Sequence, residues 1–220
     1  MNAVIPILTV FLVVAAIVAG TNGTLPNQVS GIFAGALIAI LAEPIRRWIF
    51  RPVLHLHFGD TDDYIAPSPR QADGKIVDDS IYLRVGVTNS STAVAKGCRA
   101  YITKIEERHS TTGGFYQATF SDSLRLFWAC KPTRDEKLAA IDIPKGVRQF
   151  VDVLFAASSQ PNVFTPCVEF TPLRYSELIG KAGTFRLTVM VAGDELLPAE
   201  LKLIFTWKGQ WNTFTATQET

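Results

Sequence analysis

The stretch "FRLTVMVAGDELLPAELKLIFTW", residues 185–207, decides the fold class of this chain. Large apolar residues occupy alternate positions over 185–191 and again over 201–207, and the turn region between the two runs contains Gly193-Asp194. Successive side chains of an extended chain point to opposite faces, so a period of two predicts a strand with one buried face. The stretch therefore predicts two strands separated by a turn.

The same alternation recurs upstream. "IYLRVGV" over 81–87 has its branched apolar residues on one face, and "AVAKGCRAYITKI" over 93–105 resumes the pattern after an Asn-Ser-Ser-Thr turn. "GVRQFVDVLF" over 146–155 is apolar on both faces, which is typical of a central strand. Shorter candidate strands are residues 53–58, 115–120, 124–128, 137–143 and 163–170.

About eight or nine short strands separated by turns predict an all-β fold, an antiparallel β-sandwich over residues 52–214. Only residues 175–181 have the pattern of a short helix. Residues 215–220 are expected to form a flexible tail. The acidic, proline-containing stretch 59–79 is expected to be an exposed loop.

The first 42 residues have a different composition. They contain no Asp, Glu, Lys or Arg, so all 21 basic and all 20 acidic residues lie from Glu43 onward. As helices, residues 4–20 and 25–42 would be about 26 and 27 Å long, slightly short of a ~30 Å hydrocarbon core. Residues 1–51 are therefore predicted to form a two-helix transmembrane hairpin with juxtamembrane arginines. Two alternatives stay open, a cleaved signal peptide for the first segment and a re-entrant helix for the second.

Positive charge predicts the orientation of this hairpin. Arg46, Arg47 and Arg51 follow the second segment, whereas the loop 21–30 carries no charge. The positive-inside rule places the arginines, and the sandwich after them, on the cytoplasmic side of a bacterial inner membrane. Together with Trp48, whose ring suits the membrane interface, these arginines are expected to anchor the chain at the headgroups.

A stripe of small residues on the second segment, Gly31, Gly35 and Ala39, has a spacing of four. In lipid, close backbone approach over small residues supplies the packing between helices. We expect the stripe to pack the two helices of one hairpin, and the alternative is that it pairs two chains into a homo-oligomer.

Three segments of the second part resemble a known arrangement: "YLRVGVTNSSTAVAKGCRAYI", "IDIPKGVRQFVDVLF" and "GTFRLTVMVAGDELLPAELKLIFTWKGQW". They are similar to the immunoglobulin-like sandwiches that follow membrane hairpins in bacterial proteins without an assigned activity. The resemblance implies an immunoglobulin-like architecture and carries no assigned activity. The Cys…Trp…Cys arrangement of antibody domains is missing from this sequence, so the resemblance does not extend to that lineage.

The absence of known catalytic motifs favours a non-enzymatic protein. The sequence has no P-loop, zinc-protease or nucleophile-elbow motif, and its net charge of +1 leaves no electrostatic footprint for nucleic acid. His55 and His57 would share one face of a strand, where Asp60 or Asp62 could complete a metal site. The alternative is a pair of histidines at the rim of the domain, and we expect no cofactor.

The cysteines are three and lack metal-ligand spacing. An odd number favours a reducing compartment, in agreement with the cytoplasmic assignment. Cys98 and Cys167 lie among apolar residues and are expected to be buried, whereas Cys130 beside Lys131 is the exposed candidate.

Four aromatic residues are the candidate contacts for a partner, since Trp is enriched at interaction hot spots: Phe127, Trp128, Trp207 and Trp211. The alternative is that these rings close the ends of the core. The sequence thus predicts a membrane-anchored, non-enzymatic interaction or sensing module that contacts the lipid bilayer and a protein partner. Two other hypotheses are a membrane effector whose oligomerising hairpin is controlled by the sandwich, and a metal-dependent enzyme that uses His55 and His57.

Overall fold

The computed structural model describes residues 51–72, 75–117, 122–170 and 182–219, together with Ala42 and Arg46. The chain divides into two units, residues 1–50 and 51–220, and every strand described below belongs to the second. Apart from Ala42, Arg46 and Arg51, the predicted hairpin lies outside the described residues, and this includes Gly31, Gly35, Ala39, Arg47 and Trp48. The short helix expected over 175–181 lies outside them as well. Within the described ranges, no helix has the length and apolarity needed to cross a bilayer.

The described residues form two large antiparallel sheets. The first sheet has the strand order β1 (Leu54–His57), β5 (Ser80–Asn89), β11 (Arg148–Ala157), β12 (Gln160–Pro166). Two short strands extend it, because β2 (Ile65–Pro67) pairs with β5 and β9 (Phe127–Trp128) pairs with β11.

The second sheet has the order β10 (Ile141–Ile143), β6 (Ala95–Arg108), β13 (Gly183–Asp194), β14 (Ala199–Trp207), β15 (Phe214–Gln218). The short strands β7 (Phe115–Gln117) and β8 (Leu124–Arg125) pair with β6. A separate ribbon consists of β3 (Arg70–Ala72) and β4 (Lys75–Asp78), and a short helix, α3 (Arg134–Leu138), follows β9. The all-β expectation is confirmed for the described residues, but their fifteen strands exceed the eight or nine expected, because several are only two or three residues long.

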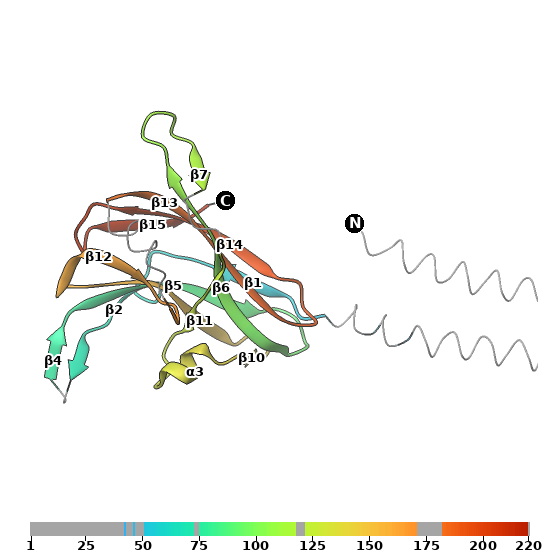
Figure 1. The fold of residues 1–220 in the computed structure, drawn as a ribbon. Coiled ribbons are helices and arrows are strands. Elements are labelled where there is room, and N and C mark those ends of the chain that lie inside the picture. Colours follow the sequence, from blue (N-terminus) through green and yellow to red (C-terminus); the bar gives the residue numbers. More distant parts are fainter. Residues whose placement is uncertain are drawn as a thin grey trace, which may run out of the picture. The chain divides into compact units, whose positions relative to one another are not determined.

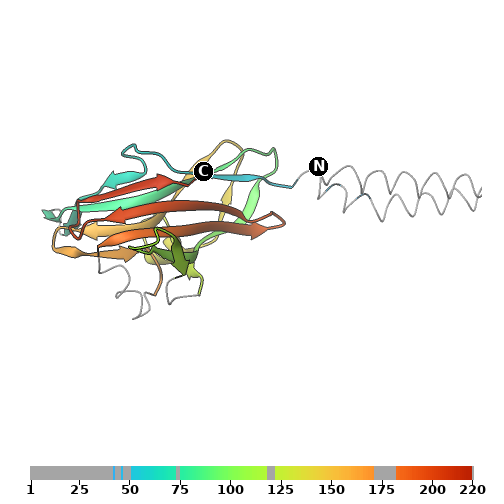
Figure 2. The same ribbon diagram turned by 90° about the horizontal axis from the view of Figure 1, so that it is seen from above.

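The two sheets pack as layers of a sandwich with one apolar core between them. Figure 1 shows β13, β14 and β15 in one layer and β2, β5 and β11 in the other, and Figure 2 shows β13 and β14 running side by side. The alternating residues predicted over 185–191 and 201–207 face inward, and Leu187, Val189 and Leu203 are fully buried. Phe164 adds an aromatic cluster, with ring centres 4.9 Å from Phe205, 5.3 Å from Trp207 and 5.2 Å from Phe214.

Two features close the sides of the sandwich. On one side the chain passes from β8 in the second sheet to β9 in the first through Leu126, which is buried. On the other side, the backbone amide of Phe58 donates to Gln218 Oε1 over 3.1 Å, which ties the end of β1 to β15. Strands that change sheets at corners are a usual device for joining the layers of a sandwich.

The expected exposed loop over 59–79 is wrong. It contains β2, β3 and β4, and Tyr64 and Ala66 are buried in it. The Tyr64 ring lies edge-on to His57, Phe58 and Phe150, at centre distances of 5.8, 5.7 and 5.6 Å. This aromatic contact folds the segment onto the outer face of the first sheet, which a polar, proline-containing composition does not reveal.

Two other boundaries differ from the sequence prediction. The flexible tail expected at 215–220 is wrong for 215–218, since Phe214–Gln218 is β15, paired along its length with β14 and burying Ala216. The strand expected at 137–143 begins as α3, whose N-cap Thr133 accepts a hydrogen bond from the amide of Glu136 at 3.2 Å, and only Ile141–Ile143 is strand. A cap side chain competes with strand pairing for the first turn of such a segment.

A buried ion-pair network lies on the outer face of the second sheet. Glu106 on β6 accepts two hydrogen bonds from the guanidinium of Arg186 on β13, at 2.6 and 2.8 Å, and one from Lys104 Nζ at 2.8 Å. Arg186 also covers the ring of Phe115 at 4.5 Å and bonds Glu219 Oε1 at 3.1 Å. These hydrogen bonds lower the pKa of Glu106 from its ordinary 4.5 to about 2, and the bonds from Arg186 have the largest effect.

Candidate functional site

The site begins with an irregularity in the central strand β11. Asp152 is paired with Arg84 on β5, but the next pair is Leu154 with Leu83, so Val153 is an extra residue. Such a bulge shifts the phase of alternation, and Val153 and Leu154 both face the core. The bulge explains why "GVRQFVDVLF" is apolar at consecutive positions.

At this bulge the neighbouring strand on one edge of β11 changes. Before it, Asp152 is paired with Phe127 of β9, and after it, Leu154 is paired with Pro166 of β12. Cys167 joins the two, because its amide donates to Val153 O at 3.0 Å and its carbonyl accepts from the amide of Phe127 at 2.9 Å. The two strands therefore diverge on the outer face of the first sheet and leave a hollow.

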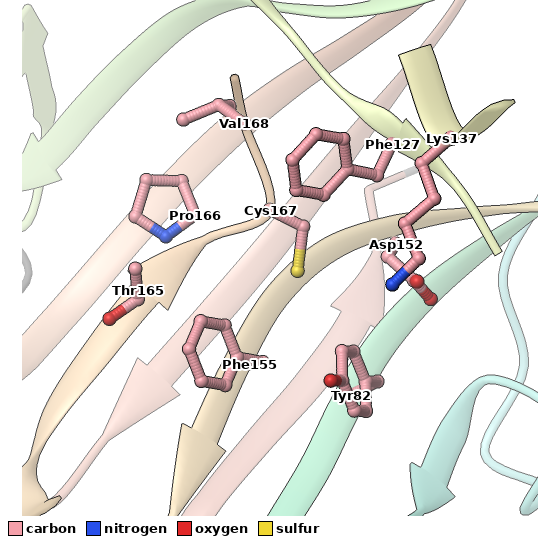
Figure 3. Close-up of a pocket in the computed structure, with 9 residues that line it drawn as sticks. All are labelled: Tyr82, Phe127, Lys137, Asp152, Phe155, Thr165, Pro166, Cys167 and Val168. Atoms are coloured by element: carbon pink, nitrogen blue, oxygen red, sulfur yellow. The ribbon is translucent and has the colours of Figure 1, made fainter. Parts of the chain in front are cut away.

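This hollow is a pocket of about 180 Å³. Its lining comes from β5, β9, β11, β12, the two residues after β12, and α3: Tyr82, Phe127, Lys137, Asp152, Phe155, Thr165, Pro166, Cys167 and Val168. Figure 3 shows the Cys167 thiol pointing into the pocket among the aromatic side chains. The Tyr82 and Phe155 rings stack with centres 5.8 Å apart and form an aromatic wall.

A buried ion pair forms one wall of the pocket. Asp152 Oδ1 accepts a hydrogen bond from Arg84 Nε at 2.8 Å, and only 4% of Asp152 is exposed. The guanidinium of Arg84 also lies over the Tyr82 ring, 5.5 Å from its centre. Burial raises the pKa of Asp152, although the Arg84 bond and the positive charge of Lys137 act in the opposite direction.

Lys137 supplies a second cation at this pocket, from α3. Its amine lies 6.0 Å from the centre of the Phe127 ring, a distance at which a cation is attracted to the ring face. The helix is held in place because the Arg125 side chain donates to the carbonyl oxygen of Leu138. No hydrogen bond or ion pair joins the Lys137 amine to another described residue, so it is available to an acceptor on a ligand.

The Cys167 thiol of the pocket is not activated as a nucleophile. Burial first, and the charge of Asp152 second, raise the pKa of the Cys167 thiol far above its usual range, so this sulfur is protonated at neutral pH and is a poor nucleophile. Sites for drug-sized molecules occupy about 300–1,000 Å³. At about 180 Å³ this pocket instead matches a single amino-acid side chain.

The predicted interaction residues have separate environments. Trp128 and Trp207 are core residues, 1% and 2% exposed, so they cannot contact a partner directly. Trp207 Nε1 donates to Gln210 O at 2.8 Å, and Trp211 packs half-buried against the core. Only Phe127 lines the pocket. Trp128 and Trp207 therefore follow the alternative, in which the rings belong to the core, whereas Trp211 stays a candidate contact.

Sequence reasoning missed most of the pocket, namely Tyr82, Lys137, Asp152, Phe155 and Cys167. One signal was present, since Asp152 interrupts an apolar strand that would otherwise be buried on both faces. A charged residue in such a run requires a partner or a function. The other residues meet only through strand pairings far apart in sequence.

The histidine pair lies on the outer face of β1 but is not assembled into a metal site. His55 Nε2 is 2.9 Å from Ser90 Oγ, whereas His57 packs against Gly86, whose backbone leaves room for the ring. Burial, followed by the charge of Arg148, lowers the pKa of His57. Among the described residues, no group of three or more His, Cys, Asp or Glu side chains could hold a metal ion.

Comparison of the sequence with family models and with curated proteins finds no match. The described residues from 51 onward form an all-β domain with sandwich-like antiparallel sheets and a small side-chain-sized pocket on one outer face.

The expected environments of the cysteines are confirmed, with Cys98 and Cys167 buried and Cys130 exposed. Burial raises the pKa of Cys98 to about 11 and raises that of Cys167 as well. Since alkylation requires an accessible thiolate, a brief treatment of the folded chain should modify Cys130 alone, measured as one mass adduct. In denaturant three adducts should appear. A Cys130→Ser chain should gain none while folded, and rapid loss of the Cys98 thiol under native conditions would contradict the structure.

Proposed function

We propose that this protein is a membrane-anchored, non-enzymatic binding module whose pocket receives one side chain of a protein partner. The observation that carries the proposal is the hollow at the Val153 bulge, where aromatic rings surround a space of about 180 Å³ beside the Lys137 amine. A side chain with an apolar body and an acceptor oxygen at its tip is complementary to this lining. Neutralisation of Asp152 by Arg84 makes a cationic side chain the poorer match.

The anchoring part of the proposal is supported by sequence. The uncharged stretch 1–42 and the arginines at positions 46, 47 and 51 favour a hairpin in the inner membrane with the sandwich in the cytoplasm. A tethered module meets partners at a membrane surface at a high effective concentration, so a pocket that holds a single side chain can suffice.

An immunoglobulin-like architecture is also part of the proposal. It is supported by the neighbours β1-β5-β11 in the first sheet and β6-β13-β14 in the second, which match the A-B-E and C-F-G neighbours of immunoglobulin domains. The topology is not identical. The strand beside E in an immunoglobulin domain is D, which precedes E in the chain, whereas β12 follows β11, and β15 adds a strand to the second sheet.

Site-specific photocrosslinking in the native host tests the pocket. A photoreactive amino acid replaces Thr165 at the pocket wall in one chain, and Thr206 on the outer face of the second sheet in another. We expect a discrete adduct from position 165 and none from position 206. Lys137→Glu should lower the yield at 165 about tenfold, since it replaces a charged hydrogen-bond donor by an acceptor.

The matched control is Lys202→Glu, which makes the same charge change on an exposed residue of β14. Its adduct yield should equal that of the unmodified chain. An adduct at position 165 that is insensitive to Lys137→Glu, or no adduct at all, would show that the pocket does not receive the partner.

A further inference from the structure

We infer that the end of the sandwich where β1 begins is a second binding surface, which docks onto a bilayer containing anionic lipid. This inference rests on the proposed membrane anchoring and adds a surface separate from the pocket. The surface, called the tether end below, comprises Val53 and the turns 90–94, 144–147 and 195–198.

Strand register brings these four segments to one end. Leu54, the first residue of β1, is paired with Asn89, the last of β5. Arg148, the first residue of β11, is paired with Thr88, and Asp194, the last of β13, with Lys96. The β5–β6, β10–β11 and β13–β14 turns therefore extend beyond the sheets on the same side, where Figure 1 shows β1 beginning beside the turn between β13 and β14.

Each of these segments presents an exposed apolar side chain. Leu197 is 65% exposed, Val53 48%, Val94 41% and Val147 38%. A single exposed apolar residue is normal on a protein surface, but four at one end of the sandwich, which the described residues leave open, are the kind of apolar surface that marks an interaction site. Their common position at one end makes a surface that can enter the headgroup region of a bilayer, as apolar residues on membrane-surface helices do.

A buried asparagine holds two of these turns rigidly. Asn89 Nδ2 donates to Ala93 O at 2.7 Å and to Ile143 O at 2.9 Å, and Asn89 O accepts from the amide of Gly146 at 2.9 Å. The amide of Ser90 donates to Val53 O at 3.0 Å. The apolar tips are therefore preorganised, which lowers the entropy lost on docking.

The position of the tether end and its charge identify a membrane as the occupant. Only eight residues separate Ala42, where the uncharged stretch ends, from Arg51, so the chain reaches at most about 30 Å between them. Lys145 and Arg148 are exposed beside the apolar tips on the side of the first sheet. Lysine and arginine near a bilayer surface are attracted by anionic lipid.

Three carboxylates lie at the same end, Asp142, Asp194 and Glu195, on the side of the second sheet. Asp142 is held against β6, since its Oδ1 accepts from the amide of Gly97 at 3.0 Å. These carboxylates outnumber the exposed Lys96 on that side, so Lys145 and Arg148 supply the attraction to anionic lipid, while the apolar tips of both sheets, Leu197 included, enter the headgroup region.

The test places a spin label on the full chain in bilayers of phosphatidylcholine with phosphatidylserine. In a Cys130→Ser background, Leu197→Cys carries the label at the tether end and Ile76→Cys carries it on β4 as the control. Docking should make the collision rate of a water-soluble nickel chelate with the label about threefold lower at position 197 than at position 76. The collision rate of oxygen, which is concentrated in the bilayer, should be higher at position 197.

A double variant, Lys145→Glu with Arg148→Glu, tests the role of charge. In it, the label at position 197 should become as accessible to the nickel chelate as the label at position 76. Lys75→Glu with Lys208→Glu changes the charge equally at exposed positions outside the tether end and should change nothing. Equal accessibility at 197 and 76 overturns the inference. Spin–spin broadening at 197 that disappears on dilution with unlabelled chain also overturns it, because a second copy would then cover the surface.

Carbonate extraction separates this result from the anchoring proposal. If the chain stays in the membrane while position 197 is water-accessible, only the docking surface is wrong. If carbonate releases the chain, the membrane anchoring fails as well.

Discussion

Replacing Trp207 by alanine is expected to lower the free energy of unfolding by about 4 kcal/mol, the usual cost of removing a fully buried aromatic side chain. Trp207 is 2% exposed and packs against Phe164, so its truncation leaves a cavity in the core. Removal of the indole also takes away one of the three donors to Gln210 O, which keeps the amide and hydroxyl of Thr213. Urea unfolding of the full chain in detergent, followed by far-ultraviolet circular dichroism, measures the loss.

The control is Trp211→Ala, which removes the same side chain from a half-buried position. It should cost about half as much, since less apolar area leaves water there. If the Trp207→Ala chain does not fold, Trp207→Phe should fold and lose about 1–2 kcal/mol through the missing hydrogen bond and volume. Equal losses at positions 207 and 211 would contradict the buried placement of Trp207.

Replacing Arg186 by methionine is expected to lower the free energy of unfolding by about 3 kcal/mol at neutral pH, because Glu106 keeps its charge but loses two of its hydrogen bonds. Lys104→Met is the matched control. The Lys104 side chain is 45% exposed, so its ion pair is screened by solvent and its loss should cost less than about 1 kcal/mol. Similar losses for the two variants would contradict the dominant role of Arg186.

The effect of Arg186→Met should depend on pH in a defined direction. The pKa of Glu106 is about 2 in the folded chain and near 4.5 when unfolded, so the folded state favours the ionised carboxyl. The stabilisation is fully present above pH 4.5 and is lost as the pH falls toward 2. The difference in unfolding free energy between the unmodified chain and Arg186→Met should therefore shrink between pH 5 and pH 2. A constant difference over this interval would contradict the assignment.

Strand patterns in the sequence predicted the class of fold because they depend on local chemistry. Alternation over 185–191 and 201–207 marks one buried face per strand, and both segments lie within β13 and β14. The pattern fails where a tertiary contact outweighs it. Tyr64 folds a polar segment onto the first sheet, and pairing with β14 makes a strand of residues expected to be a tail.

The candidate site was less accessible to sequence reasoning. Phe127 was identified by its aromatic character and lines the pocket, but Trp128 beside it points into the core. Adjacent residues of a strand face opposite ways, so which one is exposed depends on the pairing of β9 with β11. From the sequence alone, an aromatic residue is an equally good candidate contact whether its side chain points to the surface or into the core.

The sequence by itself determined that the chain joins an uncharged apolar stretch to a β-rich part of ordinary composition, and that its strands have one inner face, because charge and periodicity are properties of neighbouring residues. Only the tertiary structure decided where a pocket forms. At the Val153 bulge the strand that pairs with β11 changes from β9 to β12. Asp152, Cys167 and Lys137 come together there from separate parts of the chain. Such a meeting depends on long-range strand register, which the hydrophobic pattern of any single segment does not encode.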